Sequence, residues 1–195
     1  MDVTNILNVP FQKLNVKPGN FLVSEPFMQD PYFKRSVVFV TEHNERGSFG
    51  LIINKPLPMY LNEAIENAPA FDARLRLGGP VENETLHYLH VLGDIIPDSI
   101  EVMEGVFWGG DFNTIKRMMS SGEIKPTEIR LFIGYAGWGE GQLKSELENK
   151  SWIISDADKQ LLFNEKPENL WSEVLQKMGA PYSYLVNLPE DPRLN

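Results

Sequence analysis

The sequence SVVFVTEHNERGSFGLIIN, residues 36–54, predicts a β-hairpin around which the rest of the chain can be arranged. Two apolar runs rich in β-branched and aromatic residues, 36–41 and 48–54, are joined by a polar segment that ends at Gly47. Such runs are typical of strands, and a short polar link that ends in glycine is typical of a hairpin turn. The first run places apolar side chains on both faces of its strand, so we expect it to be covered on both sides and to lie in the middle of a sheet.

Further strand-like and helix-like segments lie on either side of this hairpin. Pro56 and Pro58 are expected to end its second strand, because proline cannot donate a ladder hydrogen bond. Other strands are predicted at residues 21–23, 74–77, 84–92, 102–108 and 128–135, and helices at residues 60–67, 112–121, 141–150 and 168–178. The strands come first as hairpin-like pairs and the helices mostly late, which favours an α+β fold with a mixed sheet.

Length and composition favour one domain. The chain has 195 residues, of which 42% are hydrophobic and 23% charged, close to the averages for globular proteins. No repeat, low-complexity tract or linker separates two folding units. Residues 1–195 are therefore expected to form a single domain, with 1–18 as an amino-terminal extension and 181–195 as a tail, each packed on the domain or partly irregular.

The compartment predicted from the sequence is the cytoplasm. The chain has no cysteine, hence no disulfide, thiolate nucleophile or cysteine zinc site. Asp2 stands where a signal peptide carries positive charge. Uninterrupted apolar runs such as 37–40 are far shorter than the ~20 residues that a membrane-spanning helix needs, so no membrane association is expected.

Net charge argues against nucleic acid as a direct partner. The formal charge is −9, and the densest basic clusters are pairs, as at residues 74–76 and 116–117. Sequence-independent affinity for nucleic acid comes mostly from Lys and Arg. We therefore expect no salt-sensitive binding to random duplex DNA at physiological ionic strength.

No metal and no cofactor are expected. The common nucleotide-binding, hydrolase and zinc-protease motifs are not found in the sequence. His87 and His90 are three residues apart on a predicted strand, so their side chains should point to opposite faces and cannot share an ion.

Four ordered motifs resemble those of the AlgH/YqgE family. They are GNFLVS with QDPYFKRSVV (19–24 and 29–38), EH with GLIINKP (42–43 and 50–56), GGPV (78–81) followed by LH (89–90), and GYAGWGEGQL (134–143), the most specific of the four. The resemblance implies a compact α+β domain with a bifurcated, partly barrel-like mixed sheet flanked by helices, in the bacterial cytoplasm. One member is named from the genetics of alginate regulation, which implies a regulatory role without naming a molecular activity.

Two glycine-rich segments are the predicted binding elements. Residues 78–81 and 137–142 each follow an apolar strand, so we expect them to meet at one end of the sheet and to form the rim of a groove. Trp138, flanked by glycines, is expected to be partly exposed there; the alternative is that it folds inward and fixes the following helix to the sheet. The binding candidates are Gly78, Gly79, Pro80, Tyr135, Gly137, Trp138, Gly139, Gly141 and Gln142.

Glycines in both segments can also be explained without a ligand, because glycine permits sharp turns. The loop at 137–141 contains no Lys, Ser or Thr, and Glu140 would repel phosphate. These observations weigh against an anion site in that loop.

Catalytic candidates are few. His43 lies at the junction of strand and turn and could serve as an acid or base, although such a histidine more often bonds the turn or lies exposed. Asp30 precedes Pro31 and is most simply a turn residue. With Asn54, they are the residues that an enzyme acting on a small polar substrate would use. The preferred interpretation is a non-catalytic binding or regulatory module that recognises a protein or small ligand through its glycine-rich loops.

Overall fold

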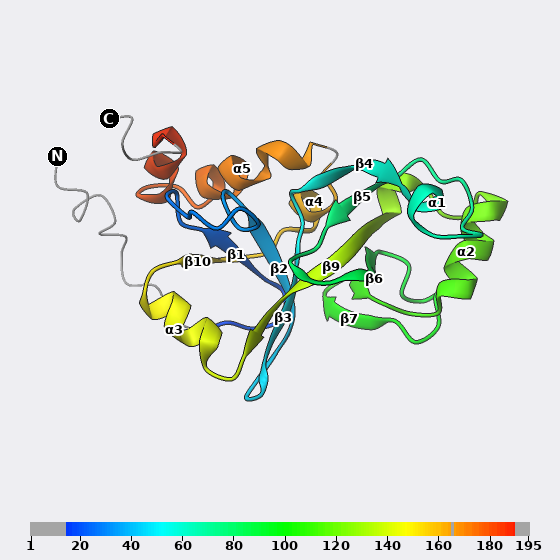
Figure 1. Cartoon of the computed structure of the whole chain (residues 1–195), viewed down its shortest axis with the longest axis horizontal. Helices are drawn as coiled ribbons and strands as arrows, with labels where there is room; N and C mark the ends of the chain where they lie inside the picture. Colours follow the sequence, from blue (N-terminus) through cyan, green and yellow to red (C-terminus); the bar gives the residue numbers. More distant parts are fainter. Residues whose placement is uncertain (1–14, 165, 190–195) are drawn as a thin grey trace.

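One large sheet with helices packed around it forms the body of the molecule in the computed structural model, which describes residues 15–164 and 166–189 (Figure 1). The strands are β1 (Asn20–Ser24), β2 (Val37–Asn44), β3 (Gly47–Ile52), β4 (Pro56–Tyr60), β5 (Arg74–Leu77), β6 (Val81–His90), β7 (Ile100–Met103), β8 (Val106–Trp108), β9 (Ile129–Gly139) and β10 (Trp152–Asp156). The helices are α1 (Leu61–Ala64), α2 (Phe112–Ser121), α3 (Gln142–Glu148), α4 (Lys159–Leu162) and α5 (Leu170–Lys177), with 3₁₀ turns η2 (Pro126–Glu128), η3 (Pro167–Asn169) and η4 (Tyr182–Asn187).

The hairpin predicted at residues 36–54 is formed by β2 and β3. β2 lies between β1 and β3, and its first four residues are completely buried. One face packs against α5 in a core that includes Phe39 and Trp171, and the other packs against α3 in a core that includes Val38 and Leu143. The predicted central, doubly covered strand is confirmed.

Neighbouring strands follow the order β10-β1-β2-β3-β9-β6-β8-β7, with β4 and β5 branching from this path. The branch occurs at β9, because Phe132 and Ile133 pair with β6 in antiparallel register and with β5 in parallel register. A strand that pairs the same residues twice has a neighbour on each edge, so β5 and β6 lie on opposite edges of β9. The α+β class and the mixed, branched sheet are confirmed, and the sheet does not close into a barrel.

The chain passes from β5 to β6 across β9, and the GGPV motif makes this crossing. Gly78 donates its N–H to the carbonyl oxygen of Ile133 at 2.8 Å on one edge, and Val81 pairs with Tyr135 on the other. A Cβ atom on Gly78 would lie 2.1 Å from the Gly134 carbonyl oxygen, and one on Gly79 would lie 2.1 Å from that of Tyr135. Only glycine allows two backbones to approach so closely.

Several segments differ from the sequence-based prediction. β4 and β10 were not predicted, and β4 begins at Pro56, where the chain was expected to leave the sheet. Proline is tolerated there because β4 is an edge strand that pairs only with β5. The single strand predicted at 102–108 is wrong: Gly105, at φ +67°, turns the chain between β7 and β8.

The predicted helix at 168–178 corresponds to η3 followed by α5, and the tail after it forms η4. Most of the predicted amino-terminal extension, residues 1–14, and the end of the tail, residues 190–195, lie outside the described residues. In the described part of the chain, no helix combines the length and the apolar character needed to cross a membrane.

Candidate functional site

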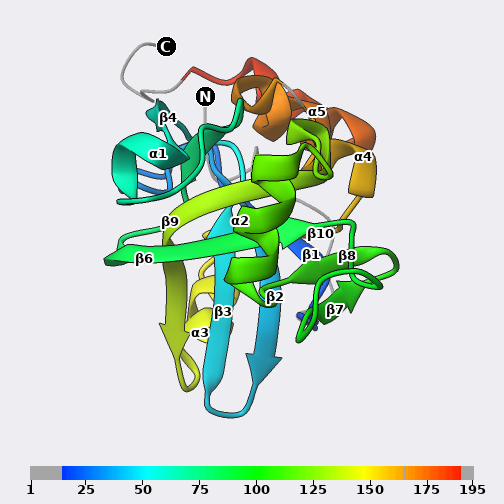
Figure 2. The ribbon, with the colours of Figure 1, turned by 90° about the vertical axis from the view of Figure 1, so that its right-hand side faces the viewer.

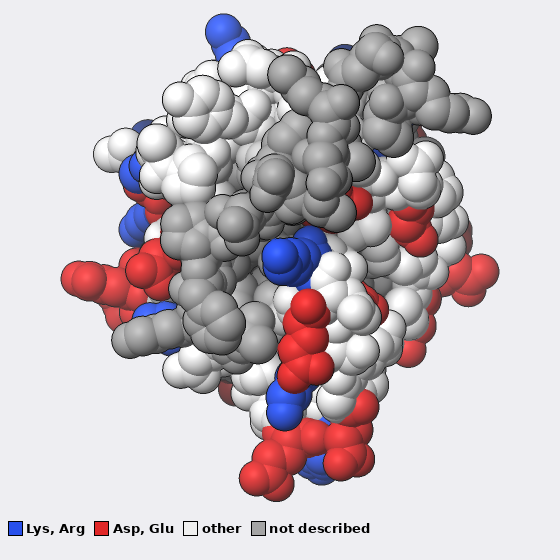
Figure 3. All heavy atoms as spheres, turned by 90° about the vertical axis from the view of Figure 1, so that its left-hand side faces the viewer, with Lys and Arg blue, Asp and Glu red and all other residues white. Residues whose placement is uncertain are grey.

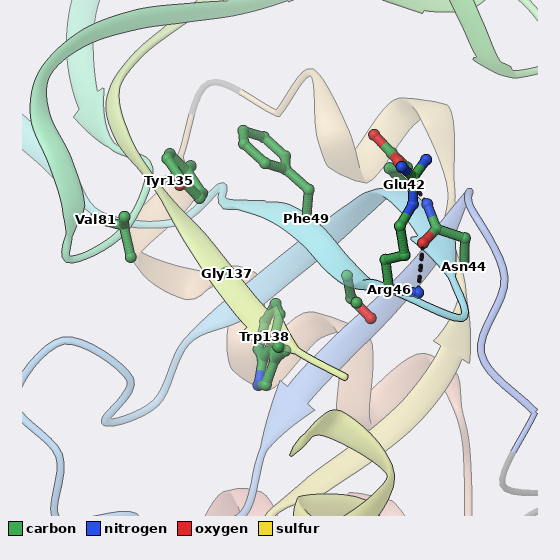
Figure 4. Close-up of a pocket in the computed structure, with 11 residues that line it drawn as sticks. Glu42, Asn44, Arg46, Phe49, Val81, Tyr135, Gly137 and Trp138 are labelled. Atoms are coloured by element: carbon green, nitrogen blue, oxygen red, sulfur yellow. Dashed lines mark hydrogen bonds between the residues drawn. The ribbon is translucent and has the colours of Figure 1, made fainter. Parts of the chain in front are cut away.

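An open hollow of about 490 Å³ lies over β3 and β9, beside the turn of the β2–β3 hairpin (Figure 4). We call it the β3–β9 hollow. It is lined by Glu42, Asn44, Arg46, Gly47, Ser48, Phe49, Val81, Tyr135, Gly137, Trp138 and Gly139.

The floor of the hollow is bare sheet backbone. Gly47 is paired with Gly139, and Phe49 with Gly137, so these four residues share one face of the two strands. Three of the four have no side chain, so the face is open at Gly139, while the edge of the Tyr135 ring reaches over Gly137, where a Cβ atom would lie 2.9 Å from Tyr135 Cε2. A Cβ atom on Gly139 would meet nothing within 4 Å, whereas one on Gly47 would lie 2.3 Å from the carbonyl oxygen of Trp138. The glycine at 47 is therefore required by packing, and the one at 139 is not.

Aromatic rings form the wall of the hollow on the side of β6. Phe49 and Tyr135 are stacked with ring centroids 4.3 Å apart, and His87 and Trp108 pack against Phe49 at 5.2 and 5.0 Å. All four side chains are partly buried. Burial lowers the pKa of His87, and the nearby charge of Glu82 opposes this shift.

Polar side chains of the hairpin turn form the opposite wall. The Asn44 amide donates to Glu42 Oε1 at 2.6 Å, and Asn44 Oδ1 accepts from the N–H of Arg46 at 2.9 Å. Figure 4 shows Arg46 and Glu42 on the same side of the strands as Phe49. The hollow therefore joins an aromatic wall to a polar one that carries both signs of charge.

Trp138 does not occupy this hollow with its ring, and the prediction that it is partly exposed is wrong. The side chain is 6% exposed and points to the face opposite Phe49 and Tyr135 (Figure 4). It stacks on Phe33 at 6.3 Å, packs edge-on against Trp152 at 5.8 Å, and donates its indole N–H to Glu146 Oε2 at 2.9 Å. The alternative considered from the sequence is correct: the ring joins α3 to the sheet.

The other predicted binding residues are brought together only in part. Tyr135, Gly137 and Gly139 line the hollow. Gly78, Gly79 and Pro80 do not, because the crossing over β9 covers the two glycines with backbone, although the next residue, Val81, borders the hollow. Gly141 caps α3 at φ +71°, and the Gln142 Oε1 accepts from the N–H of Gly139 at 3.1 Å. The segment 137–139 is the end of β9 and not a loop.

The three catalytic candidates have separate structural partners. Buried Asn54 accepts from the N–H of Val37 at 2.8 Å and donates to the carbonyl oxygen of Arg35 at 2.9 Å, so it holds β2 to the end of β3. Exposed Asp30 accepts from the N–H groups of Tyr32 and Phe33, as its predicted turn role requires. Exposed His43 Nδ1 lies 2.7 Å from Ser48 Oγ. None of the three candidates lines the hollow.

A second hollow, of about 380 Å³, was not predicted from the sequence. It lies between β5, η2 and η3 and contains two arginines that are each 7% exposed, Arg76 and Arg130. Burial and the neighbouring Arg130 lower the pKa of Arg76 to about 9, and Glu168 opposes the shift. Both guanidinium groups donate to main-chain carbonyl oxygens, including those of Phe163 and Asn164, so they tie the carboxyl-terminal segment to the sheet.

Metal-ligand geometry is not found in the described ranges, where no group of three or more His, Asp or Glu side chains could hold an ion.

The fold and the hollow together define a class of protein with an open, branched α+β sheet. In this class one glycine motif, 78–81, carries the chain across β9, and a second, 137–139, lies at the end of β9 beside the hollow. A family model described as AlgH-like matches residues 21–183, and the chain belongs to that family. The predicted resemblance is confirmed.

Relatives and solved structures agree with this assignment. A UPF0301 protein from Chlorobaculum tepidum is 43% identical over 92% of this chain and 96% of its own length, and one from Cytophaga hutchinsonii is 42% identical over 91% and 98%. The solution structure of the AlgH protein from Pseudomonas aeruginosa has a TM-score of 0.72 and 29% identity, covering 93% of this chain and 98% of that protein. A crystal structure from Corynebacterium diphtheriae, at TM-score 0.75 and 23% identity over 91% and 95%, shares the fold.

Proposed function

We propose that this chain is a non-catalytic binding or regulatory module of the cytoplasm, and that a protein or small ligand occupies the β3–β9 hollow. The observation that carries the proposal is the bare floor. Gly47, Gly137 and Gly139 lie on one face of two paired strands, next to the half-buried rings of Phe49 and Tyr135. Concave sites with aromatic walls and a few polar groups are the usual form of binding sites.

The chemistry of the lining favours binding over catalysis. Its charged residues are Glu42 and Arg46, and Glu42 is already engaged by Asn44. Asp30, His43 and Asn54 each bond to groups outside the hollow or on its rim. No acid–base pair faces the floor among the residues that the structure describes, whereas general acid–base catalysis needs such groups within ~3 Å of the reacting atoms.

The test is to fill the hollow without disturbing the fold. Gly139 has an ordinary backbone angle, and a Cβ atom there would meet open space, so Gly139→Leu should fold normally and place an aliphatic side chain on the floor. Asn113→Leu, on the exposed side of α2, is the control for an added surface leucine. Wild type and both variants would be compared in a pull-down from cell lysate and in a metabolite screen.

We expect a stoichiometric partner or metabolite that binds wild type and Asn113→Leu but not Gly139→Leu. Equal binding by all three proteins would show that the ligand sits elsewhere. Recovery of no partner and no metabolite would contradict the proposal.

One contact favours the alternative, an enzyme that acts on a small polar substrate. Ser48 Oγ and His43 Nδ1 are 2.7 Å apart, as a nucleophile and its base would be. Both are at the exposed hairpin, and no third side chain is bonded to His43 in the described residues. Turnover of an activated ester that is lost in both Ser48→Ala and His43→Ala would support this alternative; turnover unaffected by either would exclude it.

A further inference from the structure

One edge of β9 is open beside the hollow. β6 pairs with β9 only as far as Val81 and Tyr135, and the chain then crosses over β9 at Gly79 and Pro80. Residues 136–139 pair with β3 on their other edge. In the described part of the chain, no strand pairs with the outer edge of this segment, and Figure 2 shows the lower half of β9 as the margin of the sheet.

Hydrogen bonds around this segment fix which backbone groups face outward. Ile52 donates its N–H to the carbonyl oxygen of Gly78, so the backbone groups of Ile52 point to the β9 side of β3. The carbonyl oxygen of Phe49 accepts from the Thr41 hydroxyl, so it points to the opposite side, toward β2. Alternation then makes Phe49 and Gly137 a pair that exchanges no ladder hydrogen bond. The N–H and C=O of Gly137 therefore point to the open edge, as do those of Gly139.

A side chain already occupies one position on this edge. The exposed Gln142 amide oxygen accepts from the N–H of Gly139 at 3.1 Å. This is the kind of bond that the carbonyl oxygen of an added strand would make. Exposed strand edges are usually blocked by proline, bulges or charge, and here the segment 136–139 contains none of these.

The charge around the edge indicates the chemistry of a partner. Glu42 lines the hollow, and Glu45, Glu82 and Glu140 each adjoin a lining residue in the sequence, against one arginine, Arg46. Figure 3 shows acidic side chains, with fewer basic ones among them, at the lower end of the neighbouring face, where the hairpin turn lies. A partner with basic side chains would be attracted there.

We infer that the edge of β9 at 136–139 binds an extended segment of another protein as an added strand, with one large apolar side chain of that segment in the β3–β9 hollow and Lys or Arg on either side. This inference rests on the proposed function and names its ligand class. Main-chain bonds to Gly137 would supply affinity, and the bare floor beside Tyr135 would select the apolar side chain.

The experiment uses random peptides displayed on phage, selected against the full chain at low ionic strength. The best-enriched peptide is synthesised unmodified and as two N-methylated twins. One twin is methylated at the odd-numbered backbone nitrogens and the other at the even-numbered ones, so that each twin loses the N–H donors along one edge of the peptide strand. Binding is measured to wild type, Gly139→Leu and Asn113→Leu. Amide exchange of Gly137 is measured with and without peptide.

We expect enriched peptides with an apolar residue between basic ones, and slowed exchange at Gly137 in the complex. One N-methylated twin should bind about tenfold or more weakly and the other should bind normally, because only one edge of the peptide faces β9. Gly139→Leu should lose the peptide, whereas Asn113→Leu should keep it.

Other outcomes separate this inference from the proposed function. If both twins bind as tightly as the parent and Gly139→Leu still loses the peptide, the hollow is a binding site but strand addition is wrong. If no sequence is enriched, strand addition is also wrong, and the metabolite screen alone decides the proposed function. If amide exchange at Gly137 slows with rising protein concentration in the absence of peptide, a second copy of the chain occupies the edge. That result would contradict the inference that the occupant is a segment of another protein.

Discussion

The two faces of β3 and β9 are packed in opposite ways, although they belong to the same short segments. On one face, Trp138 is 6% exposed and is enclosed by Phe33, Trp152 and α3. On the other, Gly137 has only the edge of the Tyr135 ring over it, and Gly139 leaves the strand uncovered. Because successive side chains of a strand point to opposite faces, a GWG sequence puts its large residue on one side and its two gaps on the other.

The contrast shows why the glycines around Trp138 were misleading. Flanking glycines were expected to leave the tryptophan with little packing. Its neighbours in the sequence, however, are not its neighbours in space. The ring is buried by residues from the loop before β2, from α3 and from β10. The same glycines instead open the face on which the tryptophan does not lie.

The largest expected effect is on the packed face. Trp138→Ala should destabilise the protein by about 3–5 kcal/mol, because it leaves a cavity among buried aromatic side chains. Phe49→Ala, on the open face, should cost about 1–2 kcal/mol, since that ring is only partly buried. Denaturant unfolding measures both. Equal losses would show that the two faces do not differ as described.

An intermediate effect is expected at Glu146, whose Oε2 accepts from the indole N–H groups of Trp138 and Trp152 at 2.9 and 2.7 Å. Glu146→Ala would leave two buried donors without their acceptor, at a cost of about 2–4 kcal/mol, whereas Glu146→Gln keeps an acceptor oxygen and should cost about 1 kcal/mol or less. Thermal melts of the two variants check this difference. Similar melting temperatures would mean that the carboxylate does not bridge the two rings.

The smallest expected effect comes from the aromatic wall of the open face. Burial lowers the pKa of His87, so between its folded pKa and the ordinary value near ~6.5 the unfolded chain binds more protons. This contribution to stability is complete above pH ~6.5 and is lost as the pH falls through that window. His90, whose pKa is also lowered by burial, acts in the same direction.

We therefore expect wild type to be less stable at pH ~5.5 than at pH ~7.5, and the difference to shrink, without vanishing, in His87→Phe. The phenylalanine retains ring contacts with Phe49 and Trp108. Denaturant midpoints at the two pH values give the comparison. An unchanged pH dependence in the variant would show that His87 is accessible to water when the protein is folded.

Local patterns in the sequence were enough to place the central strands and several helices. Apolar residues on both faces of β2 required cover on both sides, and the cap Asp111 with the stop Gly122 set the limits of α2. The edge strand β4 and the short β10 were missed, because each is stabilised by pairing with a distant segment: β4 with β5, and β10 with β1. A prediction from neighbouring residues cannot detect such pairs.

The glycines show most clearly which features the sequence determines and which depend on the tertiary structure. From the chain alone it followed that residues 78–81 and 137–142 are places where backbone can approach something closely, because glycine has no Cβ. What approaches them depends on the folded arrangement. At Gly78 and Gly79 it is β9 itself, at Gly137 it is the edge of the Tyr135 ring, and at Gly139 the face remains open. Side-chain size and the alternation of side chains along a strand are local properties that the sequence determines. Whether another segment packs over a glycine depends on strands that pair although they lie far apart in the sequence, as β5 and β6 do with β9.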